Sequence, residues 1–243
     1  MSFFAILCAL LIEQARPLKD ANFLHTQVRS TLSWAVRQFD TGQASHARLT
    51  WLVVILLPAL IATLVHWALL YWLGWVATVV WNVVILYLTL GFRQFSHHFT
   101  DIRDALDAGD EDAARALLAQ WMHIDASDLP RSEIVRQVIA HSVLNAHRCV
   151  FGVFAWYSLL SGLGLGPAGA VMYRLAEYFS ALAKRPVSPE ALLLSPALRD
   201  YVADWWNRVD WIPARLTAMG FAFVGSFEDA IDSRDFPQLH AHL

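Results

Sequence analysis

Charged residues are scarce in this sequence. Asp, Glu, Lys and Arg make up 16% of its 243 residues, against about 25% in a typical soluble domain. Hydrophobic residues account for 57%, which excludes intrinsic disorder, because disordered chains combine low hydrophobicity with high net charge. The net charge of −3 leaves no excess of basic residues, so we expect no nucleic-acid partner. The 11 Trp and 14 Phe residues fit a chain that lies in a lipid bilayer.

Cysteine is almost absent. Cys8 and Cys149 lie in separate apolar runs and form neither a disulfide framework nor a metal-ligand spacing. A secretory signal is missing too, because Met1–Ile12 has no basic start and Glu13 stands where small residues would mark a cleavage site. We therefore expect the N-terminal segment to be retained and both cysteines to be buried as small apolar side chains.

One long stretch lacks formal charge altogether. Residues 49–92 contain no Asp, Glu, Lys or Arg, and one membrane crossing takes about 20 apolar residues. We predict two crossing helices, Trp51–Leu73 and Trp75–Leu90, with Gly74 at the reversal. Lys and Arg residues flank this stretch on both sides, so the positive-inside tendency places both flanks in the cytoplasm. The predicted location is the bacterial inner membrane, which the chain crosses more than once.

Acidic residues gather after this stretch. The run from Asp101 to Trp121 predicts two helices separated by Gly109, with Asp110 capping the second. Apolar spacing before the stretch predicts further helices. We therefore divide the chain into five segments. These are N-terminal interfacial and cytoplasmic helices (1–48), a transmembrane hairpin (49–92), a soluble acidic helical hairpin (93–135), membrane-embedded helices with a polar stripe (136–228) and a tail (229–243).

A second charge-free stretch, Cys149–Tyr173, is interrupted by the Gly- and Pro-rich run Gly162–Ala170. It either crosses the membrane once with a weakened C-terminal half, or enters and turns back at the Gly/Pro run. The prolines from Lys184 to Pro213 predict a loop with short helices, and Pro213 is expected to open the last helix with Asp210 near its cap. The predicted fold class is all-α: a polytopic helical membrane bundle with a cytoplasmic helical insert.

Motifs of the common catalytic sites are missing. The sequence has no Walker A loop, no GxGxxG before a helix, no HExxH and no GxSxG. Its ten histidines form no zinc-binding pattern, so no metal site is expected. A polar stripe does stand out before the second charge-free stretch; its members, spaced as on one helix face, are Gln137, His141, Asn145 and Arg148. The stripe either lines an interior pocket or faces solvent, because exposing it to lipid would be costly.

Near the C-terminal end, Arg215 is expected one turn into an apolar helix. Its side chain either extends to the membrane surface or binds a phosphate or carboxylate group. The surrounding residues Trp211–Ala218 (WIPARLTA), together with Tyr173–Leu182 (YRLAEYFSAL) and the Gly/Pro run, resemble the CobD/CbiB family of cobalamin-biosynthesis membrane proteins. The order of segments also agrees with that family over roughly Leu49–Phe227.

The resemblance implies a membrane protein that joins an aminopropanol unit to a corrinoid carboxylate as an amide, with ATP and magnesium. It implies the lipid bilayer as surroundings, and a corrinoid intermediate or a membrane or cytoplasmic protein as a partner. Combined with the polar stripe, it gives these candidate pocket residues: His141, Asn145, Arg148, Tyr173, Arg174, Glu177, Asp204, Asp210 and Arg215.

This chain departs from the family at several acidic positions. Where the resemblance implies acids or amides, it has Leu144, Arg148, Cys149, Glu177, Ser180 and Trp206–Asn207. Magnesium needs carboxylates, and among the candidates Glu177, Asp204 and Asp210 only Asp204 has no evident structural role. The opening LLIEQARPL is closer to the related AmpE branch. Two hypotheses follow: a CobD/CbiB-type protein of cobalamin assembly, for which ATP and magnesium apply only if it is catalytic, and an AmpE-like non-catalytic membrane regulator.

The charge pattern predicts the topology of the hairpin. A reporter fused near Gly74 should lie on the periplasmic side, and one fused near Gly109 on the cytoplasmic side, because only the flanks carry Lys and Arg. Paired fusions to a reporter that is active on one side of the membrane measure this. Equal signals from the two positions would contradict the hairpin.

Overall fold

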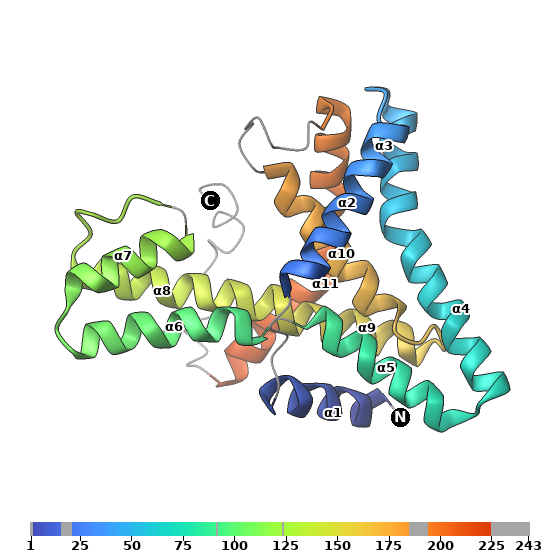
Figure 1. Cartoon of the computed structure of the whole chain (residues 1–243), viewed down its shortest axis with the longest axis horizontal. Coiled ribbons are helices and arrows are strands. Elements are labelled where there is room, and N and C mark those ends of the chain that lie inside the picture. Colours follow the sequence, from blue (N-terminus) through green and yellow to red (C-terminus); the bar gives the residue numbers. More distant parts are fainter. Residues whose placement is uncertain (1, 16–20, 91, 123, 185–193, 225–243) are drawn as a thin grey trace.

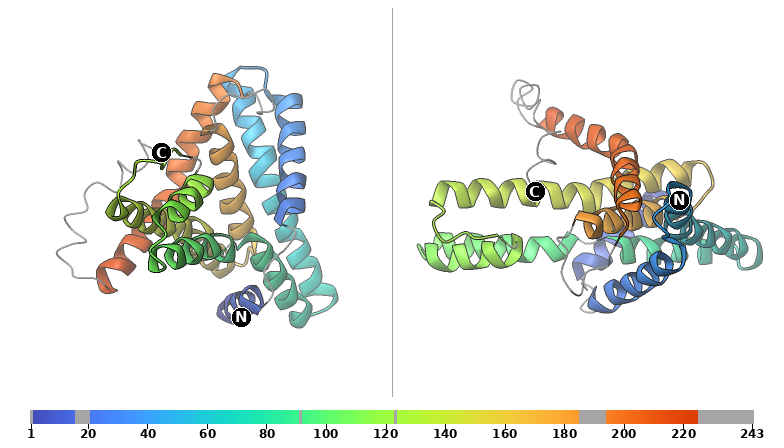
Figure 2. Two further views of the ribbon diagram at one scale, coloured as in Figure 1. Left: turned by 60° about the vertical axis from the view of Figure 1, so that its left-hand side comes forward. Right: turned by 90° about the horizontal axis from the view of Figure 1, so that it is seen from above.

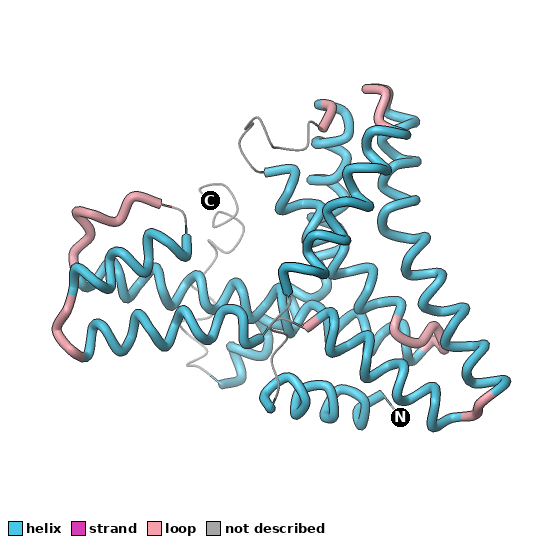
Figure 3. Tube along the Cα trace, viewed as in Figure 1, coloured by secondary structure: helices cyan, strands magenta, loops and turns pink. Residues whose placement is uncertain are grey.

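The computed structural model describes residues 2–15, 21–90, 92–122, 124–184 and 194–224. Within these ranges every regular element is a helix, as Figure 3 shows. The all-α prediction is confirmed. Helices suit such apolar segments because each helix pairs its own backbone N–H and C=O groups without help from water.

The predicted hairpin is present. Helix α3 (Ala44–Trp51), the π-helical turn η1 (Leu52–Leu56) and α4 (Leu57–Trp72) form one continuous helical rod, which α5 (Trp75–Thr89) follows. Between α4 and α5, Gly74 has a φ of 81°, in the left-handed region that favours glycine. Figure 1 shows α4 and α5 diverging from this turn.

Two N-terminal helices complete this side of the molecule. Helix α1 (Ser2–Ala15) packs along α5, and α2 (Ala21–Phe39) contacts α3 (Figure 1). The buried positions of α2 include Leu32 and Val36, which follow the helical spacing seen in the sequence. The outer face of α1, by contrast, carries exposed large apolar side chains.

Two helical stretches of the described chain are long and apolar enough to cross a membrane: Ala44–Trp72 and Arg131–Gly162. In each, only 28% of the most apolar 18-residue window is buried inside the molecule. The core helix of a soluble protein would be mostly buried, so the exposed apolar faces favour lipid as their surroundings. Helix α5 is apolar but shorter, and the number of crossings stays a prediction.

The acidic segment forms an arm with a core of its own. Helices α6 (Phe92–Asp107), α7 (Glu111–Met122) and α8 (Arg131–Ala146) enclose a small apolar cluster, and Figure 2 shows this arm reaching out to one side of the bundle. The predicted turn is confirmed, because Gly109 has a φ of 78° and the Asp110 carboxylate accepts a hydrogen bond from the Ala113 N–H at 2.9 Å.

Helix α8 continues through a second π-helical turn, η2 (His147–Phe151), into α9 (Gly152–Gly162). The chain then reverses and returns as α10 (Ala168–Lys184), which packs on α9. The chain does turn at the Gly/Pro run, and because Arg131–Gly162 is itself long enough to cross a membrane, whether the second charge-free stretch crosses or turns back within the membrane stays a prediction. Glycine permits the close contact of the two helices: a Cβ atom at Gly169 would lie 2.0 Å from the backbone oxygen of Trp156.

The last helix corrects a prediction. Helix α11 runs unbroken from Pro196 to Val224, so the expected loop with short helices is wrong from 196 onward; residues 185–193 lie outside the described chain. Pro213 sits inside α11 and does not open a helix, and Asp210 is a buried mid-helix residue, not a cap. The prediction failed because a helix can continue through proline when another partner bonds the carbonyl that the proline leaves free.

A tryptophan of the neighbouring helix supplies that partner. Pro213 has no N–H, so the carbonyl four residues earlier, at Val209, cannot form its usual bond within α11. The Trp156 indole of α9 donates to this Val209 oxygen at 2.8 Å. The hydrogen bond thus both satisfies a buried carbonyl and joins α9 to α11.

Replacing Trp156 should show how far stability depends on its hydrogen bond to the Val209 carbonyl. Trp156→Phe should lower the free energy of unfolding by about 1–3 kcal/mol, because it leaves the Val209 carbonyl buried without a partner. In a Pro213→Ala background the new backbone N–H at position 213 can bond that carbonyl, so the same Trp156→Phe change should cost clearly less. Thermal or chemical unfolding of the four proteins in detergent measures the cycle. Equal costs in both backgrounds would contradict the coupling.

Candidate functional site

A buried polar cluster lies where η2, α10 and α11 meet. The carboxylate Oδ1 of Asp210 accepts a hydrogen bond from the Tyr173 hydroxyl at 2.8 Å and lies 3.0 Å from Nε2 of His147. The other ring nitrogen of His147, Nδ1, lies 2.8 Å from the Thr217 hydroxyl. Because a carboxylate only accepts, Nε2 donates to Asp210; in the neutral ring Nδ1 then accepts from Thr217. All four side chains are buried.

The Asp210 carboxylate is favoured in its ionised form. It lies on α11, which is not one of the two candidate spans. Burial acts to raise its pKa, but the hydrogen bonds from His147 and Tyr173 and the nearby Arg148 outweigh burial and hold the pKa of Asp210 below its ordinary value. The cluster therefore contains a negative charge that its neighbours stabilise.

A second polar group lies beside this cluster. Arg174 on α10 donates from Nη1 to the Glu177 carboxylate at 3.1 Å and contacts the Cys149 sulfur at 3.4 Å. The Arg174–Glu177 pairing agrees with the sequence spacing, but both side chains are largely buried, at 21% and 15% exposure. Cys149 is therefore not simply a small apolar residue, because its sulfur accepts from a guanidinium.

The polar stripe on α8 and η2 is half-buried, which favours the interior alternative over a fully solvated face. Gln137 donates to Glu133 at 3.0 Å. The ring of His141 meets the Trp121 ring edge-on, with centroids 4.6 Å apart, and His98 stacks on the same tryptophan. Asn145 on α8 and Arg148 on η2 are half-buried as well.

Two candidates are not part of this group. Asp204 is exposed on α11. Arg215 is exposed as well, with its guanidinium carbon 3.8 Å from the centroid of the Trp211 ring. The structure thus brings Arg148, Tyr173, Arg174, Glu177 and Asp210 together and leaves Asp204 and Arg215 at the surface.

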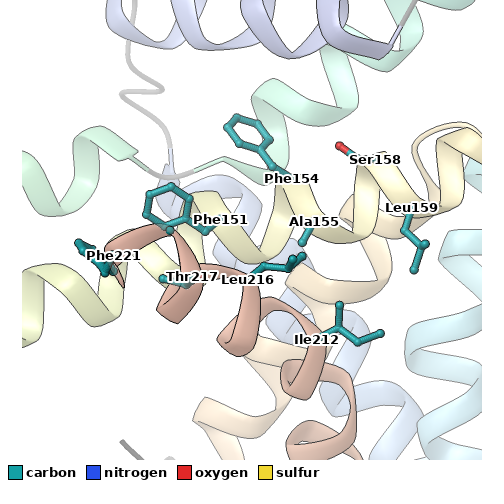
Figure 4. A pocket seen from close by; sticks show the side chains of 10 residues that line it. Phe151, Phe154, Ala155, Ser158, Leu159, Ile212, Leu216, Thr217 and Phe221 are labelled. Carbon is teal, nitrogen blue, oxygen red and sulfur yellow. The ribbon is translucent and has the colours of Figure 1, made fainter. Parts of the chain in front are cut away.

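An apolar pocket lies next to the cluster. Its volume is about 800 Å³, and α9 and α11 form its walls (Figure 4). Thr217, which lines the pocket, also bonds His147, so the pocket touches the polar cluster at one point. The lining is otherwise aromatic and aliphatic apart from Ser158, so the pocket has few groups that could orient a polar substrate.

The described carboxylates do not fit a magnesium site of the kind that the family resemblance implies. Asp210 is bonded to His147 and Tyr173, Glu177 is bonded to Arg174, and Asp204 is exposed apart from both. Within the described ranges no three His, Cys, Asp or Glu side chains are grouped so that they could hold a metal ion. Magnesium is usually held by one or two carboxylates together with water and substrate phosphates, and each of these three carboxylates is either bonded within the chain or apart from the others.

Sequence reasoning missed His147 and Thr217. His147 does not share the spacing of the polar stripe, and its contact with Asp210 depends on the π-helical turn at 147–151, which no sequence pattern announced. Thr217 is a polar residue in an apolar helix, and its partner lies 70 residues earlier in the chain. The one signal in the sequence was that His147 lies between Asn145 and Arg148, two members of the polar stripe.

Comparison with known proteins now places the chain in a class. The family model described as CobD/Cbib protein matches residues 7–183, about three quarters of the chain. The chain belongs to the CobD/CbiB family.

Two relatives carry a more specific name. The cobalamin biosynthesis protein CobD of Stutzerimonas stutzeri is 27% identical over 237 residues, covering 94% of this chain and 72% of that protein. The cobalamin biosynthesis protein CobD of Chromobacterium violaceum is 29% identical over 149 residues, covering 59% of this chain and 43% of that protein. No solved structure gives a significant match.

The buried cluster predicts a large difference between two aspartates of α11. Asp210→Ala should lower the free energy of unfolding by about 3–5 kcal/mol, because it leaves His147 and Tyr173 buried without their acceptor. Asp204→Ala, an exposed site on the same helix, should change it by no more than about 0.5 kcal/mol. Unfolding in detergent, followed by tryptophan fluorescence, measures both. Similar effects of the two variants would contradict the cluster's structural role.

Proposed function

We propose that this chain acts at a membrane in the step of cobalamin biosynthesis that joins an aminopropanol unit to a corrinoid carboxylate. We further propose that its own residues do not carry out the ATP- and magnesium-dependent activation, so that it serves as a scaffold or partner subunit for that step. Family membership and the names of the two relatives support the cobalamin association. The exposed apolar helices support the membrane location.

One observation carries the non-catalytic part of the proposal. The candidate acidic side chains are either bonded to other side chains of this chain or separated from one another. The carboxylates of Asp210 and Glu177 each bond to side chains of this chain, and Asp204 is exposed at the surface. A carboxylate held by His147 and Tyr173 would have to lose those partners before it could bind a cation. That loss would cost the stability that the hydrogen bonds provide.

The alternative of an AmpE-like regulator stays a separate prediction. Neither of the two relatives above bears that name, and no described contact favours it over a cobalamin role.

Complementation tests the proposal directly. In a strain that lacks its own corrinoid amide ligase, with aminopropanol supplied, expression of this chain alone should not restore cobalamin synthesis, because the activating site is incomplete. Growth that depends on cobalamin measures the outcome. Rescue that is lost in Asp204→Asn but kept in Asp200→Asn, an exposed aspartate one turn earlier on α11, would establish an enzyme and contradict the non-catalytic role.

Binding of a corrinoid would distinguish a non-catalytic member of the family from a protein with no cobalamin role. The purified chain should bind a corrinoid that bears a free side-chain carboxylate, and the coloured ligand should quench the fluorescence of the 11 tryptophans in a saturable way. The same corrinoid with that carboxylate already amidated should bind more weakly. Absence of saturable binding by either compound would contradict the cobalamin role itself.

A further inference from the structure

The apolar pocket between α9 and α11 is open to the surroundings of these helices. Its wall from Phe151 to Leu159 belongs to Arg131–Gly162, one of the two stretches long enough to cross a membrane. Leu159 and Leu216, on opposite walls, are 46% and 52% exposed. Figure 4 shows side chains of both helices around the pocket. A contiguous exposed apolar surface of this kind marks a place where another apolar group binds.

Gly220, on the α11 wall, has no packing reason to be glycine. Glycine is unfavourable within a helix, and two other helical glycines of this chain permit close contacts, Gly152 with Tyr173 and Gly169 with Trp156. A Cβ atom at Gly220 would instead meet no described atom within 4 Å outside its own helix. Because Gly220 lines the pocket, the side chain that it lacks leaves this space open.

A hydrocarbon chain suits the pocket better than a polar ligand does. Among the described residues that line it, only Ser158 and Thr217 have polar side chains, and none is charged. The Thr217 hydroxyl is already bonded to His147. The volume of about 800 Å³ lies within the range of ligand pockets, roughly 300–1,000 Å³. The pocket therefore offers space and apolar contact but few hydrogen bonds.

We propose that this pocket holds one acyl chain of a phospholipid from the surrounding bilayer. The proposal rests on the membrane location given above but not on the corrinoid role. Lipid is the occupant at hand, because the α9 wall continues the exposed apolar surface of a stretch that is long enough to cross the membrane. The gain comes from packing, since an empty space would leave the lining without contacts. The chain would lie against Thr217, where the pocket touches the Asp210 cluster.

Carbene labelling in lipid nanodiscs tests the site with the whole chain. The probe is a phosphatidylcholine that carries a diazirine in one acyl chain, diluted into ordinary phosphatidylcholine, and peptide mass spectrometry locates the labelled residues. We expect labelling at Ala155 and Thr217, which are half-buried and buried in the pocket walls, so that a lipid at the outer surface would not reach them. Leu64 on α4, 59% exposed, is the internal reference for ordinary lipid contact.

Filling the pocket should remove this labelling. Gly220→Phe should lower the labelling of Ala155 and Thr217 severalfold and leave that of Leu64 unchanged, because the added ring occupies the space of the acyl chain. The matched control is Gly162→Phe, since a Cβ atom at Gly162 also has open space around it but lies outside the pocket; it should be labelled like the wild-type chain. Should Gly220→Phe fail to fold, Ala155→Phe on the opposite wall replaces it and should lower the labelling of Thr217 to the same extent.

Three results would overturn the proposal. Labelling of Leu64 without Ala155 and Thr217 would show that lipid surrounds the helices but stays out of the pocket; the same pattern together with dimers in the nanodiscs would assign the pocket to a second copy of the chain. Equal labelling of the wild-type and Gly220→Phe chains would show that the labelled residues are reached by another route. Absence of labelling at Leu64 as well would contradict the membrane location itself, whereas the corrinoid role is decided separately by the corrinoid titration.

Discussion

The carboxylate of Asp210 is the point on which the arrangement of three helices depends. A single negative charge inside an apolar bundle is tolerated only where donors surround it. Tyr173 from α10 and His147 from η2 are those donors, and Thr217 completes the bonding of the histidine. Because the donors come from different helices, α8–η2, α10 and α11 cannot shift independently without exposing an unpaired group.

Several smaller features serve this interaction. At Gly152 a Cβ atom would lie 2.1 Å from the ring carbon Cζ of Tyr173, so only glycine lets the tyrosine reach Asp210 past α9. The π-helical turn at 147–151 sets the direction of His147. Immediately before Asp210, the Trp156 indole donates a hydrogen bond to the Val209 carbonyl that Pro213 leaves free. Packing, backbone irregularity and polar bonding thus act at the same junction.

The parts of the fold that sequence predicted are those governed by local chemistry. Gly74 and Gly109 adopt positive φ at the turns where the charge pattern and glycine placement expected them, and Asp110 caps α7. The errors are non-local. Pro213 looked like a helix start because the indole that satisfies Val209 lies more than 50 residues away in sequence. The candidate site was predicted in part, since Asp210, Tyr173 and Arg174 were named, whereas His147 depends on a π-helical turn that composition and spacing do not reveal.

The π-helical turn η2 also affects how this chain should be aligned with others. Its backbone bonds span one residue more than those of an α-helix, so the residues that follow are rotated by about 100° relative to an uninterrupted helix. A homologue whose helix lacks this turn would present a different residue at each position of the face after 151, although its sequence aligned without a gap. In such an alignment, an acidic residue of the homologue near Arg148 and Cys149 would be matched to a position of this chain that is displaced by one residue. Deleting one residue from this chain at the turn would restore the regular α-helical phase.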